Sequence, residues 1–444
     1  MTVRSISRFS LIVVALLVAG CAGVGTRSAA PVAGPTREVL PNGVVLIVQE
    51  HRAGDVVALQ LWMRTGGRDE SADELGLSHY LEHMLFKGTP TRPPGSIDQL
   101  IEGIGGSSNA FTSYDYTHYD VVVPSAQLRV AVELLADIAV NAAFVREELE
   151  SEKKVVFEEM KLTEDDADRF LSRRLSEVAY APHPYGRPIL GTPALVQGLT
   201  RERLDAYYKK HYVPRNMVLV VVGAVEPAQA RRMAAAAFGA LAGAAPARPS
   251  PAPLPGVDAG RRDDIRRAEQ QAYLGLAWQT PAVSNEDIFA VDVLTYILGD
   301  GSSSRLNQTV REQKGLVSAI EASYVAREQA GLVSVTAHME ADKLEAAEAA
   351  ILDVLRRVRA EGVTAAERDR ALITAEASYA FDLETAEGVA KTYGQAETTW
   401  TLDNELRYLE RLRKVTVEQI QAAARRYFGD DNYARVRFVP GAGR

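Results

Sequence analysis

Cysteine is nearly absent from this 444-residue chain, in which Cys21 is the only one. A single cysteine cannot form an intrachain disulfide, and it excludes a metal site built from several thiolates. Histidine is also scarce, with 7 residues in the whole chain. Any bound metal must therefore be held by a few histidines together with aspartate or glutamate.

The chain also lacks an excess of positive charge, because Lys and Arg total 50 against 58 Asp and Glu, giving a formal net charge of -8. An acidic surface repels phosphate groups, so nucleic acid is not expected as a partner. The hydrophobic share of 47% and the charged share of 24% are typical of an ordinary globular protein. The length allows two domains of about 200 residues each.

The N-terminus has the features of a targeting segment. Residues 11–19 are apolar but too few to span a bilayer, and Arg4 and Arg8 precede them, which predicts a signal peptide over residues 1–20. The sequence LVAGC at 17–21 resembles a bacterial lipobox and predicts lipidation of Cys21; a plain secretory signal with an incidental cysteine is the alternative. We expect a periplasmic, lipid-anchored protein. No Asp follows Cys21, which favours the outer over the inner membrane.

Two stretches rich in small residues and proline divide the chain. Residues 21–36 are interpreted as a tether and residues 239–262 as an Ala/Pro-rich linker. They leave an N-terminal domain over 37–238 and a C-terminal domain over 263–444. Each half opens with an apolar strand, at 56–63 and 272–278, and continues with helix, strand and long amphipathic helix in the same order. This parallel order predicts an α+β protein whose two domains arose by duplication.

The strongest motif is HYLEH at residues 79–83. In a helix His79 and His83 stand one turn apart, which lets two imidazoles bind one Zn²⁺. Glu82 is offset from that face and can activate a zinc-bound water as general base. The order of residues is the reverse of the H-E-x-x-H motif. Ser71 and Asp73 predict the helix start, and a chance match on a surface helix is the alternative.

A third ligand is expected from an acidic helix predicted over residues 146–161. Glu152 and Glu159 are seven residues apart and share a face with Val155 and Val156. Two carboxylates on an apolar stripe require a cation nearby. This favours Glu159 as a zinc ligand and Glu152 as the acceptor that orients a ligand imidazole. A merely solvated acidic face is the alternative, and spacing alone does not choose between Glu158 and Glu159.

Together these motifs resemble the pitrilysin/insulinase (M16) family of zinc peptidases, especially its shorter members related to mitochondrial processing peptidase. Residues 76–78, 85–89, 183–186 and 191–192 are also similar to that family. The resemblance implies two α/β-sandwich domains of the duplicated LuxS/MPP-like metallohydrolase fold, facing each other across a cleft. It implies a zinc-dependent endopeptidase of peptides or unfolded polypeptides, with one Zn²⁺ per chain on His79, His83 and Glu159. His183 is expected to shape a loop.

The resemblance also suggests where substrate binds. A Gly/Ser stretch at 105–108 enters a strand and indicates an exposed sheet edge, to which an extended peptide can add. The family uses such a strand, so Asn109, Ala110 and Phe111 are expected to contact substrate; an ordinary strand start is the alternative.

One departure from the family concerns the second half. Active members carry an Arg and, seven residues later, a Tyr; Arg311 fits the first position, but Ser318 occupies the second. Tyr324 lies nearby in sequence. We interpret the chain as the zinc-bearing half of a heterodimer whose partner carries the Arg/Tyr pair. A homodimer and a non-catalytic scaffold of the same fold are the alternatives.

Overall fold

The structure is a computed structural model that describes residues 34–246, 254 and 261–441. The predicted signal peptide, Cys21 and most of the tether and linker lie outside the described residues. Within the described residues, no helix combines the length and apolar character that crossing a membrane requires.

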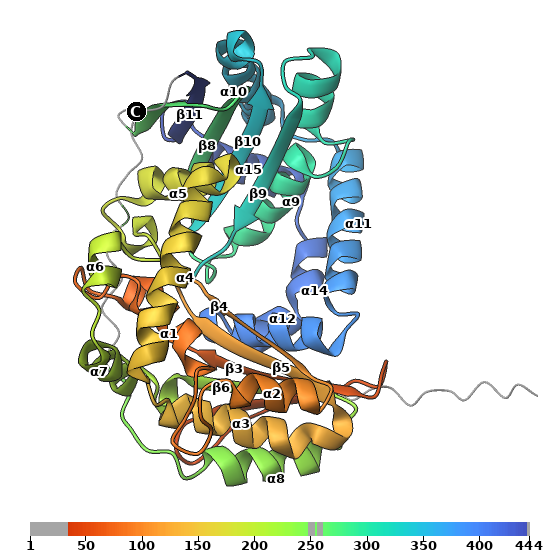
Figure 1. Cartoon of the computed structure of the whole chain (residues 1–444). Helices are drawn as coiled ribbons and strands as arrows, with labels where there is room; N and C mark the ends of the chain where they lie inside the picture. Colours follow the sequence, from red (N-terminus) through yellow and green to blue (C-terminus); the bar gives the residue numbers. More distant parts are fainter. Residues whose placement is uncertain (1–33, 247–253, 255–260, 442–444) are drawn as a thin grey trace, which may run out of the picture. The chain divides into compact units, whose positions relative to one another are not determined.

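Six strands form the first sheet in the order β1-β2-β6-β3-β5-β4 (Figure 1). Their bounds are β1 (Thr36–Val39), β2 (Val45–Glu50), β3 (Val56–Met63), β4 (Ser107–Thr112), β5 (Thr117–Pro124) and β6 (Met217–Gly223). β2 and β6 pair in parallel, and the other neighbours are antiparallel. The central strand β6 reads MVLVVVG and is buried along its whole length, as expected for a strand covered on both faces.

Five strands form the second sheet in the order β7-β11-β8-β10-β9. Their bounds are β7 (Arg262–Arg267), β8 (Ala272–Thr280), β9 (Ala319–Val325), β10 (Gly331–Met339) and β11 (Ala434–Pro440). β7 and β11 pair in parallel and the remaining neighbours are antiparallel. This is the order and direction of β2-β6-β3-β5-β4, so the predicted α+β fold with two repeated halves is confirmed.

The helices repeat in the same order. Those of the first half are α1 (Leu77–Leu85), α2 (Ser96–Gly103), α3 (Leu128–Asn141), α4 (Arg146–Asp165), α5 (Ala167–Tyr180), α6 (Pro193–Gln197), α7 (Arg201–His211) and α8 (Pro227–Phe238). Those of the second half are α9 (Asp287–Gly299), α10 (Leu344–Glu361), α11 (Ala365–Asp382), α12 (Ala386–Thr399), α13 (Leu402–Leu406), α14 (Tyr408–Arg413) and α15 (Val417–Tyr427). By their place between equivalent strands, α1 corresponds to α9, α4 to α11, and α5 to α12.

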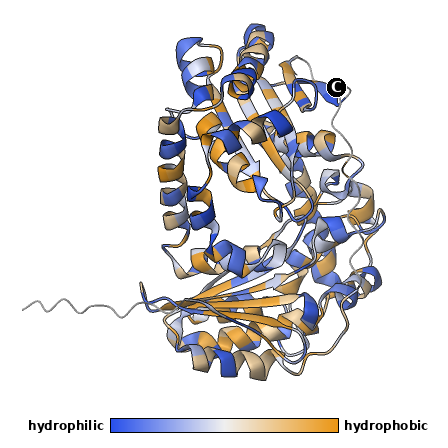
Figure 2. Cartoon of the chain, turned by 180° about the vertical axis from the view of Figure 1, so that it is seen from behind, coloured by the Kyte–Doolittle hydropathy of each residue, from blue (hydrophilic) through white to orange (hydrophobic). Residues whose placement is uncertain are grey.

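The equivalent helices α5 and α12 are exchanged between the halves. α12 packs on β3 and β6 of the first sheet, where Val389, Ala390 and Tyr393 join the core around Trp62. α5 packs on β8 and β11 of the second sheet. Figure 2 shows the apolar strands of the first sheet between two layers of helices. In each half, the helices of that half cover one face of its sheet, and a helix of the other half covers the opposite face.

A partly buried arginine, Arg327, holds the β9–β10 loop against the first half. The guanidinium of Arg327 lies 4.9 Å from the ring centroid of Tyr114, 5.2 Å from that of Tyr185 and 5.4 Å from that of Tyr180. Aromatic faces attract a cation, most strongly where water is excluded. Because these tyrosines belong to the first half and Arg327 to the second, the contact joins the two halves.

Candidate metal centre

The helix that carries the motif is α1, and it begins at Leu77. The predicted start at Ser71 or Asp73 is wrong, because the Ser71 N–H donates to Glu74 Oε2 at 3.0 Å and closes a separate turn. Gly76 then turns the chain into α1 with a φ of 92°, a conformation that only glycine adopts at low cost.

The N-terminus of α1 is held by a buried carboxylate, Glu70. It accepts hydrogen bonds from the backbone N–H of Gly76 at 2.9 Å and of Ser78 at 2.7 Å. Desolvation by burial raises the pKa of Glu70 to about 8. Glu70 therefore satisfies helix N–H groups that would otherwise be unpaired next to the first histidine of the motif.

Three side chains from two helices converge beside α1. His79 Nε2 lies 3.4 Å and His83 Nε2 lies 3.5 Å from Glu159 Oε2, a carboxylate of α4. The ligand atoms of all three lie within 4.8 Å of one another, and no other group of this kind occurs among the described residues. The structure thus brings together the three residues that the sequence singled out.

The chemistry of these donors fits a zinc ion. Glu159 Oε2 is buried and has no hydrogen-bond partner among the described residues. Burial and the neighbouring His83 lower the pKa of His79 to about 4, and a metal ion binds imidazoles in their neutral form. Two imidazoles and one carboxylate are a ligand set of catalytic zinc sites, in which a fourth position stays open.

Glu152 orients His83, as the sequence predicts. Its Oε2 lies 2.9 Å from His83 Nδ1, and its Oε1 lies 2.8 Å from Lys87 Nζ. Burial lowers the pKa of His83, but contacts with the carboxylates of Glu152 and Glu159 outweigh it and raise the value to about 9. Lys87 was missed by the sequence analysis, although its position one turn after His83 is a signal that could have found it.

The face of α4 that meets α1 differs in one residue from the predicted stripe. Glu152 and Val156 are buried, but Val155 is 41% exposed. The prediction that Val155 lies on the buried stripe was therefore wrong. Residues seven apart define a narrow face of the helix, and two adjacent valines do not both fit on it. Glu158 is exposed and Glu159 is half-buried. Exposure therefore separates the two glutamates that spacing alone left open.

Glu82 lies beside the converging side chains and is held by a residue that the sequence analysis did not select. The hydroxyl of Thr112, the last residue of β4, donates to Glu82 Oε2 at 2.5 Å. Burial raises the pKa of Glu82, which is the direction that suits a carboxylate exchanging protons near neutral pH. Thr112 directly follows the predicted substrate contacts at 109–111, but only tertiary packing brings it to α1.

Strand β4 is the edge of the first sheet. It pairs with β5 on one side, and no strand among the described residues pairs with its other side. Asn109 is exposed, Ala110 is half-buried and Phe111 is 52% exposed. The exposed edge predicted from the sequence is therefore present, next to Thr112.

The residues selected in the second half lie outside this cluster. Arg311 is exposed, and its Nε lies 3.9 Å from Glu312. The hydroxyl of Ser318 donates to the carbonyl oxygen of His338 at 3.2 Å, and Tyr324 lies on β9. His183, which is 2% exposed, accepts from the Tyr185 N–H at 3.1 Å; it shapes a loop, as predicted.

A duplicated α+β fold with this reversed motif on one helix and a carboxylate from a second helix defines the class of inverted zinc metallopeptidases. Comparison with known proteins agrees. Residues 45–193 match the family model described as insulinase (peptidase family M16), and residues 198–374 match the model described as the peptidase M16 inactive domain. The chain belongs to the M16, or insulinase, family.

Its relatives and structural neighbours cover nearly the whole chain. An uncharacterized zinc protease of Mycobacterium leprae is 32% identical over 91% of this chain and 92% of its own length. The uncharacterized zinc protease YmxG of Bacillus subtilis is 30% identical over 91% of this chain and 98% of its own length. A protease from Helicobacter pylori superposes with a TM-score of 0.87 at 25% identity, covering 92% of this chain and 100% of its own. These matches make the chain similar to zinc proteases.

Proposed function

We propose that this protein is a zinc-dependent endopeptidase of the bacterial periplasm that hydrolyses peptides or unfolded polypeptides. The observation that carries the proposal is the convergence of His79, His83 and Glu159, with Glu82 held beside them by Thr112. Lipidation of Cys21 would anchor the enzyme, with the outer membrane favoured.

The roles of the side chains follow from their positions. His79, His83 and Glu159 would hold one zinc ion, which acidifies water and polarises a carbonyl group. Glu82 takes the proton of the attacking water and delivers it to the leaving amine. Thr112 keeps Glu82 in one orientation through its hydrogen bond.

Substrate is proposed to bind along the free edge of β4. An extended peptide there would form main-chain hydrogen bonds like an added strand. Asn109, Ala110 and Phe111 are the contacts proposed from the family resemblance. Because β4 also supplies Thr112, the strand that binds the peptide would directly contact the general base.

The proposed assembly is a heterodimer in which this chain supplies zinc. Ser318 stands where active members of the family carry a tyrosine, and a serine hydroxyl is too short to replace a phenol. A partner with the Arg/Tyr pair would complete the enzyme. Full peptidase activity of the purified chain alone would contradict this part of the proposal, and no activity with any partner would favour a scaffold.

The decisive variant is Glu82→Gln. We expect it to lower the rate of cleavage of an internally quenched unfolded peptide by at least about 100-fold, with roughly one zinc per chain retained. Metal content by mass spectrometry and hydrolysis with and without chelator measure both. Glu158→Gln, an exposed neighbour on α4, is the control. Unchanged turnover in Glu82→Gln would rule out the assigned role.

A further inference from the structure

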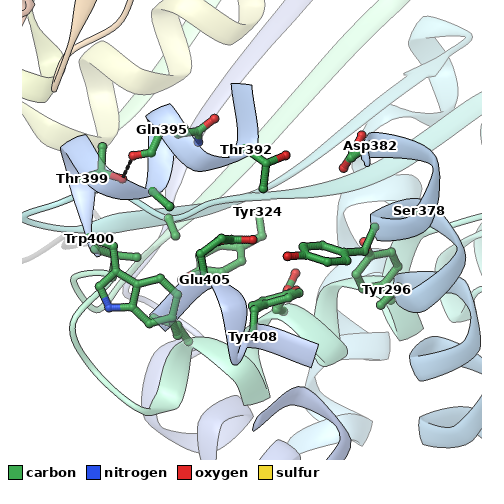
Figure 3. A pocket seen from close by; sticks show the side chains of 17 residues that line it. Tyr296, Tyr324, Ser378, Asp382, Thr392, Gln395, Thr399, Trp400, Glu405 and Tyr408 are labelled. Atoms are coloured by element: carbon green, nitrogen blue, oxygen red, sulfur yellow. Dashed lines mark hydrogen bonds between the residues drawn. The ribbon is translucent and has the colours of Figure 1, made fainter. Parts of the chain in front are cut away.

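The second half contains a cavity of about 400 Å³ (Figure 3). Its walls come from α9, α11, α12, α13, α14 and β9 together with the loops next to them. The volume falls in the range of small-molecule sites. No residue of the metal cluster contributes to it.

The cavity lies at the second repeat's counterpart of the metal site. In the first half, α1, α4 and β4 supply the histidines, Glu159 and Thr112; their equivalents α9, α11 and β9 supply Asp292, Tyr379 and Tyr324 to the cavity. No histidine lines the cavity, and among the described residues its acids do not form a metal-binding group. The duplicated position therefore has a different chemistry, one that is not suited to a metal ion.

Aromatic rings form much of the wall, as Figure 3 shows. They are Tyr296, Tyr324, Tyr379, Trp400 and Tyr408. The rings of Tyr379 and Tyr408 are stacked, with centroids 5.7 Å apart. The hydroxyl oxygen of Tyr324 is buried and has no hydrogen-bond partner among the described residues. Electron-rich ring faces favour a cationic ligand.

The cavity lining contains acidic side chains but no basic ones. Asp292, Asp382 and Glu405 line the cavity, and its lining residues include no Lys or Arg. Asp292 accepts a hydrogen bond from the Tyr408 hydroxyl, and burial raises the pKa of Asp292 to about 6 and that of Glu405 above its usual value. Such carboxylates are costly to bury without a cation, so a bound cation would relieve that cost.

One nearby arginine does not fill this role. The Arg411 guanidinium lies 5.7 Å from the Trp400 ring centroid, but it pairs with Glu286 and does not line the cavity. Its charge is therefore already paired with a carboxylate that does not line the cavity.

We propose that this cavity binds a small organic cation, an ammonium or guanidinium group, which Asp292 and Glu405 pair with and the tyrosine and tryptophan rings surround. The group can belong to a free amine or to a lysine or arginine side chain of a peptide, since both present the same chemistry. The proposal does not depend on peptide hydrolysis at the metal centre.

The test uses the full chain and two matched probes. Butylammonium chloride and its neutral isostere 1-butanol are titrated separately, with binding followed by calorimetry and tryptophan fluorescence. We expect saturable binding of butylammonium and none of butanol. Equal binding of butylammonium and butanol overturns the proposal, as does a failure of both butylammonium and the peptide acetyl-Gly-Lys-Gly-amide to bind.

Variants of the lining test whether butylammonium binds in the cavity. A lysine-containing peptide tests whether the natural ligand is a peptide side chain or a free amine. Glu405→Gln should weaken butylammonium binding at least about tenfold, whereas Glu384→Gln, an exposed residue outside the lining, should not. Asp292→Asn is the second cavity variant if Glu405→Gln does not fold. Unchanged affinity in the folded variant overturns the proposal. Acetyl-Gly-Lys-Gly-amide binding in place of butylammonium indicates a peptide side chain, and the reverse indicates a free amine.

Discussion

At the scale of single residues, the metal centre depends on contacts behind its ligands. Lys87 pairs with Glu152, and Glu152 pairs with the Nδ1 atom of His83. A carboxylate in this position fixes the tautomer and the orientation of the imidazole. The geometry at His83 is thus set by α4 as well as by α1.

Glu152→Gln tests this arrangement. The amide keeps the shape of the side chain but removes its charge, so we expect zinc affinity to fall roughly 10–100-fold. Competition with a chromophoric chelator measures the change. Glu147→Gln, at an exposed position of the same helix, should bind zinc as the wild type does. Equal affinity in Glu152→Gln would show that Glu152 does not support His83.

The sequence predicts this site well where helical geometry is local. His79 and His83 are one turn apart, and Glu152 and Glu159 are two turns apart, so each pair shares a face before any tertiary contact forms. Helical periodicity does not predict the roles of Thr112 and Glu70, because Thr112 lies at the end of a strand and Glu70 in a loop, and both contact α1 only in the folded chain. Local periodicity carries no information about those meetings.

At the scale of elements, helix α11 begins with a charged cap. Thr364 and Glu367 form a capping box, and Glu367 also receives two hydrogen bonds from Arg305. The Arg305 hydrogen bonds, opposed by burial and helped by Thr364, lower the pKa of Glu367 to about 2. The folded state therefore binds a proton at Glu367 less readily than the unfolded chain does.

This gives a pH prediction with a definite sign. The contribution of Glu367 to stability is complete above about pH 4.5 and is lost as the pH falls toward about 2. Between pH 5 and 3, the free energy of unfolding in urea should fall less steeply for Glu367→Gln than for the wild type. Glu361→Gln, exposed at the end of α10, should follow the wild-type slope. Parallel curves for Glu367→Gln and wild type would contradict the assignment.

The docking of α12 on the first sheet depends on a glycine. A Cβ atom at Gly394 would lie 2.0 Å from Trp62 Nε1, whereas one at Gly103 would meet nothing within 4 Å. We expect Gly394→Ala to lower the free energy of unfolding by about 1–3 kcal/mol, and Gly103→Ala to be neutral or slightly stabilising. Chemical denaturation of both variants measures these changes. Equal stability of Gly394→Ala and Gly103→Ala would mean that α12 moves to accept the methyl group without loss of free energy of unfolding.

The sequence predicts where strands lie but not which sheet a helix packs against. The strand at 56–63 is found with its predicted bounds, because its β-branched and aromatic residues lie between turn signals. The acidic helix runs to Asp165, four residues further than predicted from its apolar spacing. The exchange of α5 and α12 was not predicted, because an apolar helix face does not encode which of two similar sheets it covers.

At the scale of the whole molecule, the exchange joins the two halves into one structure. The chain from Pro35 onward forms a single unit, and each sheet has one face covered by a helix of the other half. Removing either half would expose the apolar face that its helix covers. The halves should therefore not be stable apart.

Calorimetry of the purified chain tests this dependence. We expect one unfolding transition for both halves, because loss of α5 or α12 from one sheet exposes apolar surface on both. Separately produced fragments 35–246 and 261–441 should fail to show cooperative unfolding. Two well-separated transitions, or two folded fragments, would show that the exchanged helices contribute little.

The reciprocal positions of α5 and α12 also bear on ancestry. Two identical copies of a single repeat could exchange this helix, so that each copy covers the exposed sheet face of the other. A symmetric dimer of such short chains would already have the whole architecture. In a covalently joined pair, one copy can lose its metal ligands while the other keeps them. The histidines of α1 and their absence at the corresponding place on α9 are the outcome that such a fusion permits.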